Sequence, residues 1–259
     1  RIRGGFSFRS EADHTVAFAP ATEWKANSPH TLVWYNKGTF AQVKVEYAVK
    51  TPDGAWSAWK PAFTGDEWMT NTPDAQNFSS YAWTVPDPAL DTVTNSYPAE
   101  PPEYYLMKVR VTNRADETIY GETPVFILGY YTVTWKVKDY DNMALLDALT
   151  VRAVDADGTI YWSVDAGKLG VDPLIPTKIY TRRFPYNAQV TTFWSKEEYI
   201  DRADNDRAIN QNQTITFLLE SRLSAQQEFK VWGNFAYDED SDKLTANVWL
   251  EKKGTLITG

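Results

Sequence analysis

The feature that most constrains the fold is the stretch from Val125 to Trp135, which reads VFILGYYTVTW. From Tyr131 to Val137, apolar residues occupy every second position, and Thr or Lys residues lie between them. This period-two alternation indicates a β-strand with one buried face. Only Gly129 separates this strand from the apolar run before it. Because such a join leaves no room for a flexible linker, the sequence predicts two β-rich units joined directly.

The same pattern occurs at the start of the chain, where residues 2–8 (IRGGFSF) resemble residues 127–133 (ILGYYTV). We interpret both stretches as seams in a row of β-modules, with residues 1–4 as the remnant of a preceding module. The seam formed by Leu128, Gly129 and Tyr130 is predicted to be rigid and to fix the angle between two modules.

Composition limits the class of protein. A chain of 259 residues, 43% of them apolar, is expected to form one or two domains. Its net charge of −8 is spread along the chain without a cluster of Lys and Arg, which argues against a nucleic-acid partner. No apolar run approaches the roughly 18 residues that a membrane-spanning helix needs. The chain contains no cysteine and starts at Arg1 without a signal peptide, so we expect a disulfide-free piece of a longer protein.

Residues 5–129 carry strand patterns separated by turns, about seven in number, which is typical of a β-sandwich. The clearest strand runs from Gln42 to Lys50 and ends at a Thr-Pro-Asp-Gly turn. The segments 61–79 and 87–102 show no periodicity and are interpreted as insertions. The second of them holds four prolines and is expected to be exposed.

The motifs of this module appear in the order VKVEYAV (43–49), YAWTVPD (81–87), LMKVRVTN (106–113) and IYGETPVFIL (119–128). In this order they resemble the immunoglobulin-like (Ig-like) domain of the fungal cell-wall-synthesis family, which also recurs in tandem in large bacterial surface proteins. The resemblance covers nearly the whole module. It implies an extracellular sandwich that carries no catalytic residues.

Residues 130–222 predict a second sandwich, in which strands at 149–154 and 159–164 flank an Asp-Ala-Asp-Gly hairpin signal. Three of its motifs, LTVRAVDADG, FPYNAQVTTFWSKEEYID and QTITFLLE, are similar to those of carboxypeptidase regulatory-like domains, which are transthyretin-like Greek-key sandwiches. This resemblance implies a stalk or spacer. Some domains of this shape carry a Lys–Asn isopeptide bond, for which Lys136 or Lys138 with Asn212 would be the candidates. Solvent-facing residues on strands are the simpler interpretation.

Residues 223–259 predict a hairpin around the acidic run at 238–242 and the start of a further strand. Two or three strands are too few for an independent core. We therefore interpret this segment as an incomplete β-module or as strands that pair with another chain. The predicted fold class is all-β, with tandem Ig-like and Greek-key sandwich modules joined by short rigid junctions.

The sequence offers little for catalysis. Without cysteine there is no thiol nucleophile, and the two histidines, His14 and His30, fall in turn regions of the first module. No GxSxG motif or similar nucleophile context is present, and two histidines are few for a zinc site. The chain is therefore not expected to be an enzyme.

Calcium is the only metal that the sequence suggests, and no other cofactor is expected. Asp238, Asp240 and Asp242 alternate as in a DxDxD loop, although the Gly and Glu of an EF-hand are missing. Residues 139–142 (DYDN) form a second acidic cluster at a strand end. A solvated turn is the simpler interpretation of each cluster.

Two further sets of residues suggest contacts with sugars. Asn77 and Asn212 each begin an N-x-Ser/Thr triplet, the acceptor of N-glycosylation in exported proteins. Trp56, Trp59 and Trp68 could form an aromatic platform for a glycan, or they could fill the core of the sandwich.

These features together predict a non-enzymatic structural module array of a large secreted or cell-surface protein. The array would form a fibre, an S-layer-type lattice or an adhesive stalk. Its expected partners are copies of itself or neighbouring modules of the same chain, with cell-surface glycans as further candidates. The alternative hypothesis is a carbohydrate-binding module of an exported multidomain protein.

Overall fold

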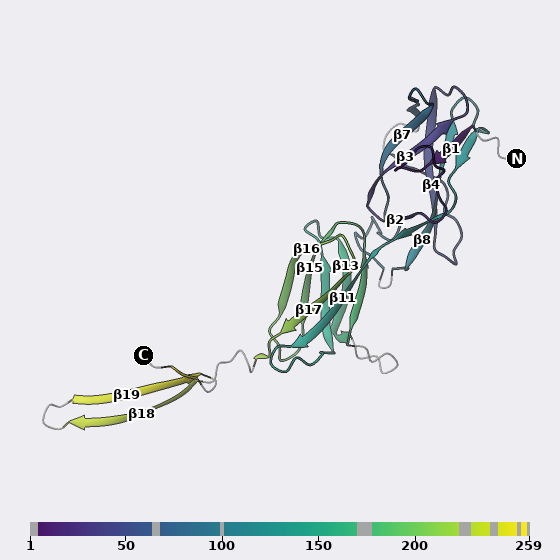
Figure 1. Cartoon of the computed structure of the whole chain (residues 1–259). Coiled ribbons are helices and arrows are strands. Elements are labelled where there is room, and N and C mark those ends of the chain that lie inside the picture. The colour runs from purple at the N-terminus through teal and green to yellow at the C-terminus, as the bar shows by residue number, and fades with distance from the viewer. Residues whose placement is uncertain are drawn as a thin grey trace.

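The computed structural model describes residues 5–63, 68–98, 101–169, 178–222, 229–238, 243–252 and 255–257. For residues 165–169 and from 229 onward it describes the backbone alone. The described elements are β-strands arranged in several separate sheets (Figure 1). The predicted all-β class is therefore confirmed. Within the described part of the chain, no helix is long and apolar enough to cross a membrane.

In the described part of the first module there are ten strands, β1 to β10. They are β1 Phe6–Arg9, β2 Glu23–Lys25, β3 Pro29–Asn36, β4 Gln42–Lys50, β5 Lys60–Pro61, β6 Met69–Thr70, β7 Phe78–Thr84, β8 Tyr104–Asn113, β9 Tyr120–Glu122 and β10 Phe126–Gly129. One sheet has the order β1-β3-β7 and the other has the order β2-β10-β8-β4-β5, with β6 on β4 and β9 on β8.

Aromatic residues join the two sheets of the first module. Trp83 of β7 contacts Trp24 of β2 and Tyr47 of β4, with ring centroids 6.2 and 5.7 Å apart. Trp34 of β3 is fully buried, as are the inward valines of β4 and β8. The two sheets therefore pack face to face as a β-sandwich.

Seven strands are described for the second module, leaving aside residues 170–177. They are β11 Tyr131–Asp139, β12 Leu149–Val154, β13 Ile160–Leu169, β14 Tyr180–Phe184, β15 Ala188–Ser195, β16 Arg202–Ile209 and β17 Gln213–Leu219. The sheets have the orders β14-β11-β17 and β13-β12-β15-β16. The predicted hairpin joins β12 to β13, and Gly158 in its turn has a φ of 81°.

A cluster of tryptophans fills the core of the second module. Trp135 of β11 lies 5.8 Å from Trp162 of β13 and 5.8 Å from Trp194 of β15, measured between ring centroids. Phe184 of β14 contacts the edge of Trp135, and all four side chains are buried. Because these residues come from both sheets, they hold the sandwich closed without a disulfide.

The remaining strands form a separate three-stranded sheet. They are β18 Phe229–Asp238, β19 Lys243–Lys252 and β20 Thr255–Ile257, in the order β18-β19-β20 with both pairs antiparallel. β18 and β19 are the two arms of the hairpin predicted around residues 238–242, of which 239–242 lie outside the described residues.

In both modules an early strand pairs in parallel with the last strand. In the first module, β2 pairs with β10 over three residues, from Glu23 opposite Ile127 to Lys25 opposite Gly129. In the second module, β11 pairs with β17 over seven residues, from Val133 opposite Gln213 to Asp139 opposite Leu219. Since paired parallel strands point the same way, the chain leaves each module at the end opposite to where this early strand starts.

Several strand predictions differ from the structure. Residues 15–19, expected to continue the first strand, make only an isolated bridge at Ala17, and Trp56 to Trp59 run outside any strand. Strands β2, β14 and β16 were not predicted. β16 reads RADNDRAI, and this polar edge strand is defined by its pairing with β15 and not by an apolar pattern.

Candidate functional site: the joint between the two modules

The seam between the modules is a single residue. Strand β10 ends at Gly129 and β11 begins at Tyr131, which leaves only Tyr130 outside a strand. Leu128 is fully buried, and Tyr130 is only 5% exposed. A Cβ at Gly129 would lie 2.8 Å from Glu23 Oε1, the end of a flexible side chain that would have to move aside. All three predicted junction residues thus lie inside a packed joint.

A carboxylate lies at the centre of the joint. Asp87 Oδ1 accepts a hydrogen bond from the Tyr130 hydroxyl (2.7 Å), and its Oδ2 accepts one from the Tyr97 hydroxyl (2.6 Å). The amide of Ala89 also donates to Asp87 Oδ1, at 3.0 Å. Burial raises the pKa of Asp87, although these hydrogen bonds act in the opposite direction. Burial and the neighbouring Asp87 charge raise the pKa of both tyrosines, which keeps them as donors.

The segment that follows Asp87 corrects one expectation. Residues 87–98, which we call the strap, were expected to be an exposed insertion, but they run from the first module onto the second. Ile160 of β13 accepts a hydrogen bond from the Tyr97 amide (2.9 Å) and donates one to the Asn95 carbonyl (3.0 Å). The Tyr97 ring stacks on Tyr161, with centroids 4.8 Å apart at 21°. Only the outer turn of the strap fits the expectation, with Val93 92% exposed.

Two arginines of β14 hold the strap and the residues after it. Arg182, only 5% exposed, donates to the Pro98 carbonyl at 2.8 Å and to the Tyr161 carbonyl. Arg183 donates to the Pro101 carbonyl at 3.0 Å. The carbonyls of Pro98 and Pro101 belong to residues that have no backbone N–H to donate. The two arginines therefore supply donors to these carbonyls from the second module.

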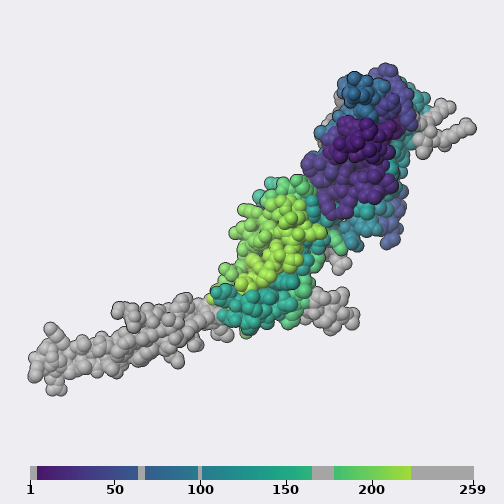
Figure 2. Space-filling model, viewed as in Figure 1, coloured from purple at the N-terminus to yellow at the C-terminus, as the bar shows by residue number. Residues whose placement is uncertain are grey.

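A third set of contacts lies beside β2. Lys25 Nζ donates to the Tyr130 carbonyl at 3.2 Å and lies 5.1 Å from the centre of the Tyr131 ring. The amide of Tyr186, in the turn between β14 and β15, donates to the Ala26 carbonyl at 2.7 Å. The modules therefore touch through the seam, the strap and this turn. Figure 2 shows the two bodies in direct contact along the joint.

The described side chains of the joint bind one another and leave no reactive group among them unbound. The carboxylate is bound by its donors, the tyrosines are held protonated, and the arginines bind carbonyls. Within the described residues, no group of three or more His, Cys, Asp or Glu side chains could hold a metal ion.

The predicted calcium residues lie mainly outside the described part. Asp238 ends β18, of which the backbone alone is described, and Asp240 and Asp242 lie outside the described residues. In the second acidic cluster, Asp139 accepts hydrogen bonds from the amides of Asp141 and Asn142 and, through Oδ2, from Tyr199 (2.6 Å). The Tyr199 bond is the main cause of a lowered Asp139 pKa. This carboxylate caps a turn.

Both sequon asparagines are exposed at turns, Asn77 just before β7 and Asn212 just before β17. The side chain of Asn212 accepts a hydrogen bond from the Thr132 amide at 2.9 Å. Lys136, suggested as its isopeptide partner, lies opposite Thr216, four residues along the strand. Four residues span about 13 Å, so the register separates this lysine from Asn212, and Lys138 is farther still.

The three tryptophans of the predicted sugar platform lie on the outer face of the larger sheet of the first module. Lys108 Nζ lies 5.0 Å from the Trp56 ring centre and 4.6 Å from that of Trp59. Trp68 lies farther along the same face, 5.0 Å from Lys44 Nζ. All three rings are partly buried, and none belongs to the core between the sheets.

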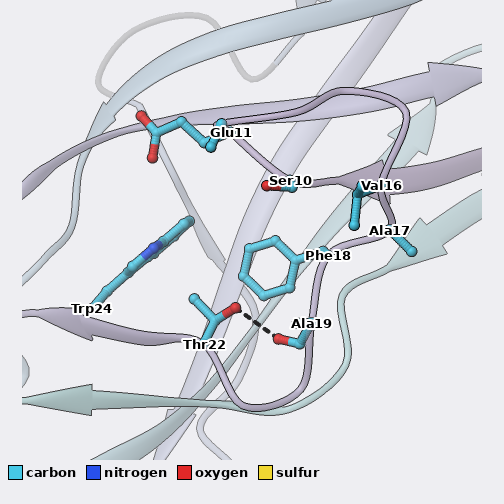
Figure 3. A pocket seen from close by; sticks show the side chains of 9 residues that line it. Ser10, Glu11, Val16, Ala17, Phe18, Ala19, Thr22 and Trp24 are labelled. Atoms are coloured by element: carbon cyan, nitrogen blue, oxygen red, sulfur yellow. Dashed lines mark hydrogen bonds between the residues drawn. The ribbon is translucent and has the colours of Figure 1, made fainter.

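A pocket of about 380 Å³ opens on another side of the first module, between the ends of β1 and β2 (Figure 3). Its walls are mainly apolar and include the rings of Phe18 and Trp24, which contact each other edge to face with centroids 5.5 Å apart. The carboxylate at its rim, Glu11, already accepts hydrogen bonds from His30 Nδ1 (2.9 Å) and the Thr31 amide (2.7 Å). A single carboxylate bound in this way does not form an acid–base pair with a second carboxyl group.

No protein-family model and no curated protein matches this chain, so the two family resemblances drawn from its motifs are not supported. Among solved structures, it is similar to the group B streptococcus pilus 2b backbone protein, at 12% identity over 84% of this chain and 98% of that chain, with a TM-score of 0.29. Two structures of BcpA, the major pilin subunit of Bacillus cereus, match at 12% and 13% identity. Each covers 83% of this chain and 69% of that chain, with TM-scores of 0.30 and 0.28. Scores this low carry no argument, so function is argued from this chain alone.

Proposed function

We propose that the chain is a tension-bearing segment of an extracellular structural protein, built from sandwich modules in series and without catalysis. The observation that carries this proposal is the parallel pairing of β2 with β10 and of β11 with β17. β11 is the first strand of the second module and β17 is its last, so this pair lies directly on the path of any force along the chain, whereas β1 precedes β2 in the first module.

The direction of the strands decides how such a pair responds. Tension pulls the start of β11 one way and the end of β17 the opposite way, so the two strands are sheared along their length. All seven residue pairs then resist together. Each hydrogen bond contributes about 1 kcal/mol net, so a sheared ladder must lose several kcal/mol in one step. A ladder pulled apart from one end would instead lose one hydrogen bond at a time.

The joint supports the same function. Modules in series stay aligned under tension only if the connections between them hold. Here the strap adds a second connection to the covalent seam. We accordingly propose the division into modules at residues 5–129 and 130–222, with 223–259 as an incomplete module or as strands that pair with another copy. A fibre, a surface lattice or an adhesive stalk would each use such a segment.

Single-molecule pulling in two geometries tests the proposal. The chain has no cysteine, so a thiol handle can be placed at one chosen residue. Handles at Arg1 and Gly259 shear β11 against β17, whereas handles at Arg1 and at Gln211→Cys pull both strands from the same end and unzip them. We expect the unfolding force of the second module to be at least about twofold lower in the unzipping geometry.

The first module provides an internal control, because both geometries load it in the same way. Its unfolding force should not differ between them. Equal forces for the second module in the two geometries would show that the parallel ladder does not carry the load, and the proposal would then fail.

A further inference from the structure

The outer face of the larger sheet of the first module carries an unusual surface. Alternation along β8 places Lys108, Arg110 and, just past its end, Arg114 on this face. On the neighbouring strand, Lys44 and Glu46 lie opposite Thr112 and Arg110. Lys44 and Glu46 are buried although they point away from the core, so other residues must cover them.

Aromatic rings provide that cover and form a continuous row with the cations. Lys108 lies between Trp56 and Trp59, at 5.0 and 4.6 Å from their ring centres. Arg110 continues the row, at 4.2 Å from Trp59 and 5.8 Å from Tyr120. Farther along, Trp68 lies near Lys44 and Arg114, at 5.0 and 5.9 Å. We call this row the aromatic–cation track.

The rings are the outer layer of the track. Lys108 and Arg110 project from the strand itself, and the side chain of each is only 23% exposed. They are therefore covered by the rings, each of which keeps part of its own surface exposed. From Lys108 to Arg114 the strand advances six residues, or about 20 Å, which is the length of several sugar units.

Among the described residues of the track, cations outnumber acids, although the chain as a whole is acidic. Its described cations are Lys44, Lys50, Lys108, Arg110 and Arg114, and the described acids beside them are Glu46 and Glu122. The whole chain carries a net charge of −8. The ligand that complements this face is therefore anionic, and flat rings set among the cations favour one that can also stack.

We propose that the aromatic–cation track binds an acidic polysaccharide, with sugar rings stacked on the exposed faces of Trp56 and Trp59 and the anionic chain attracted by the charge of Lys108 and Arg110 beneath the rings. The cations hold the rings in place before the ligand arrives, which lowers the entropy lost on binding. This function goes beyond the bearing of tension, because it would attach the segment to a surface along its side.

Titration calorimetry with polygalacturonate tests the proposal, using its neutral methyl ester and polyglutamate as comparison ligands. The ester keeps the sugar chain without the charge, and polyglutamate keeps the charge without the sugar rings. We expect the whole chain to bind polygalacturonate at least tenfold more tightly than either. Trp59→Ala should weaken binding at least tenfold, and Lys108→Gln should weaken it several-fold.

Lys136→Gln is the matched control, because Lys136 lies on a strand of the second module and should leave binding unchanged. Trp59→Phe keeps a ring over the cations and provides a second variant if Trp59→Ala does not fold. The proposal is overturned if polygalacturonate does not bind, if polyglutamate binds equally well, or if the folded Trp59 variants bind like the unaltered chain. These residues lie outside the β2–β10 and β11–β17 ladders, so this failure would leave the pulling result intact.

Discussion

Replacing Tyr97 by phenylalanine tests whether the joint stabilises the protein. The substitution keeps the ring that stacks on Tyr161 and removes only the hydroxyl, which donates to Asp87 at 2.6 Å. The carboxylate is then left with fewer donors in a buried place. A hydrogen bond to a charged group contributes about 1.5–3 kcal/mol, so we expect the free energy of unfolding to fall by about this amount.

Tyr130→Phe should have a similar effect, because its hydroxyl donates to the other oxygen of the same carboxylate. Since both tyrosines act on one group, the double variant should differ from the sum of the single variants by about 0.5 kcal/mol or more. Urea unfolding followed by tryptophan fluorescence measures all three changes. Tyr140→Phe is the control, because Tyr140 is 55% exposed and its loss of a hydroxyl should change stability by less than about 0.5 kcal/mol. If Tyr97→Phe is as stable as this control, the carboxylate does not hold the joint.

Two further predictions concern pH and backbone packing. Burial raises the pKa of Asp87 in the folded chain, so the folded chain binds a proton at this carboxyl more tightly than the unfolded chain does. The contribution of Asp87 to stability should therefore increase as the pH falls from neutral through the folded-state pKa. It should level off once the pH is below the pKa of Asp87 in the unfolded chain. Asp87→Asn should remove this increase in urea unfolding measured across pH, and an unchanged pH profile would contradict the assignment. Gly121→Ala should destabilise the first module, because the new Cβ would lie 2.4 Å from the Phe6 carbonyl oxygen. Gly158→Ala places its Cβ in open space but at positive φ, so it should lower the free energy of unfolding by only about 1 kcal/mol. Equal decreases in melting temperature for the two variants would contradict this prediction.

The sequence predicted best those strands that alternate cleanly and end at a turn. Strand β4 and strand β12 have the predicted bounds, because apolar residues alternate through each of them and a Thr-Pro-Asp-Gly or Asp-Ala-Asp-Gly turn follows. Strand β16 was missed because its residues are largely polar. It is an edge strand, where charged side chains such as the paired Asp204 and Arg207 are common because they discourage pairing with other chains.

The joint was predicted only in part for a different reason. The seam at Leu128, Gly129 and Tyr130 is local, so its apolar pattern appears in the sequence. The strap is ordered by contacts between residues far apart in the chain, such as Tyr97 with Tyr161 and Pro98 with Arg182. A proline-rich stretch without periodicity carries no sign of such partners, and β14, which supplies the arginine, was itself missed.

The aromatic–cation track was also predicted only in part, because it too depends on contacts between segments far apart in the chain. Alternation along β4 correctly placed Lys44 on the outer face of the sheet, which for a lysine suggests exposure to solvent. In the structure that face is covered by Trp56, Trp59 and Trp68, which come from segments outside the strands that they cover. The sequence identified the three tryptophans, but it could not show that cations lie beneath their rings.

Under the proposed function, the joint and the parallel β11–β17 ladder would act on the same force in different ways. A single covalent connection at Tyr130 would resist stretching but would allow the modules to bend about that point. The strap starts at Asp87 on the first module and reaches Ile160 on the second, so it adds non-covalent contacts to the covalent connection. Bending the modules apart therefore requires loss of the Tyr97 stack and of the Arg182 hydrogen bond as well as rotation at the seam. Under the proposed function, these contacts would keep tension directed along the strands, which is the direction in which a parallel ladder would resist it as a whole.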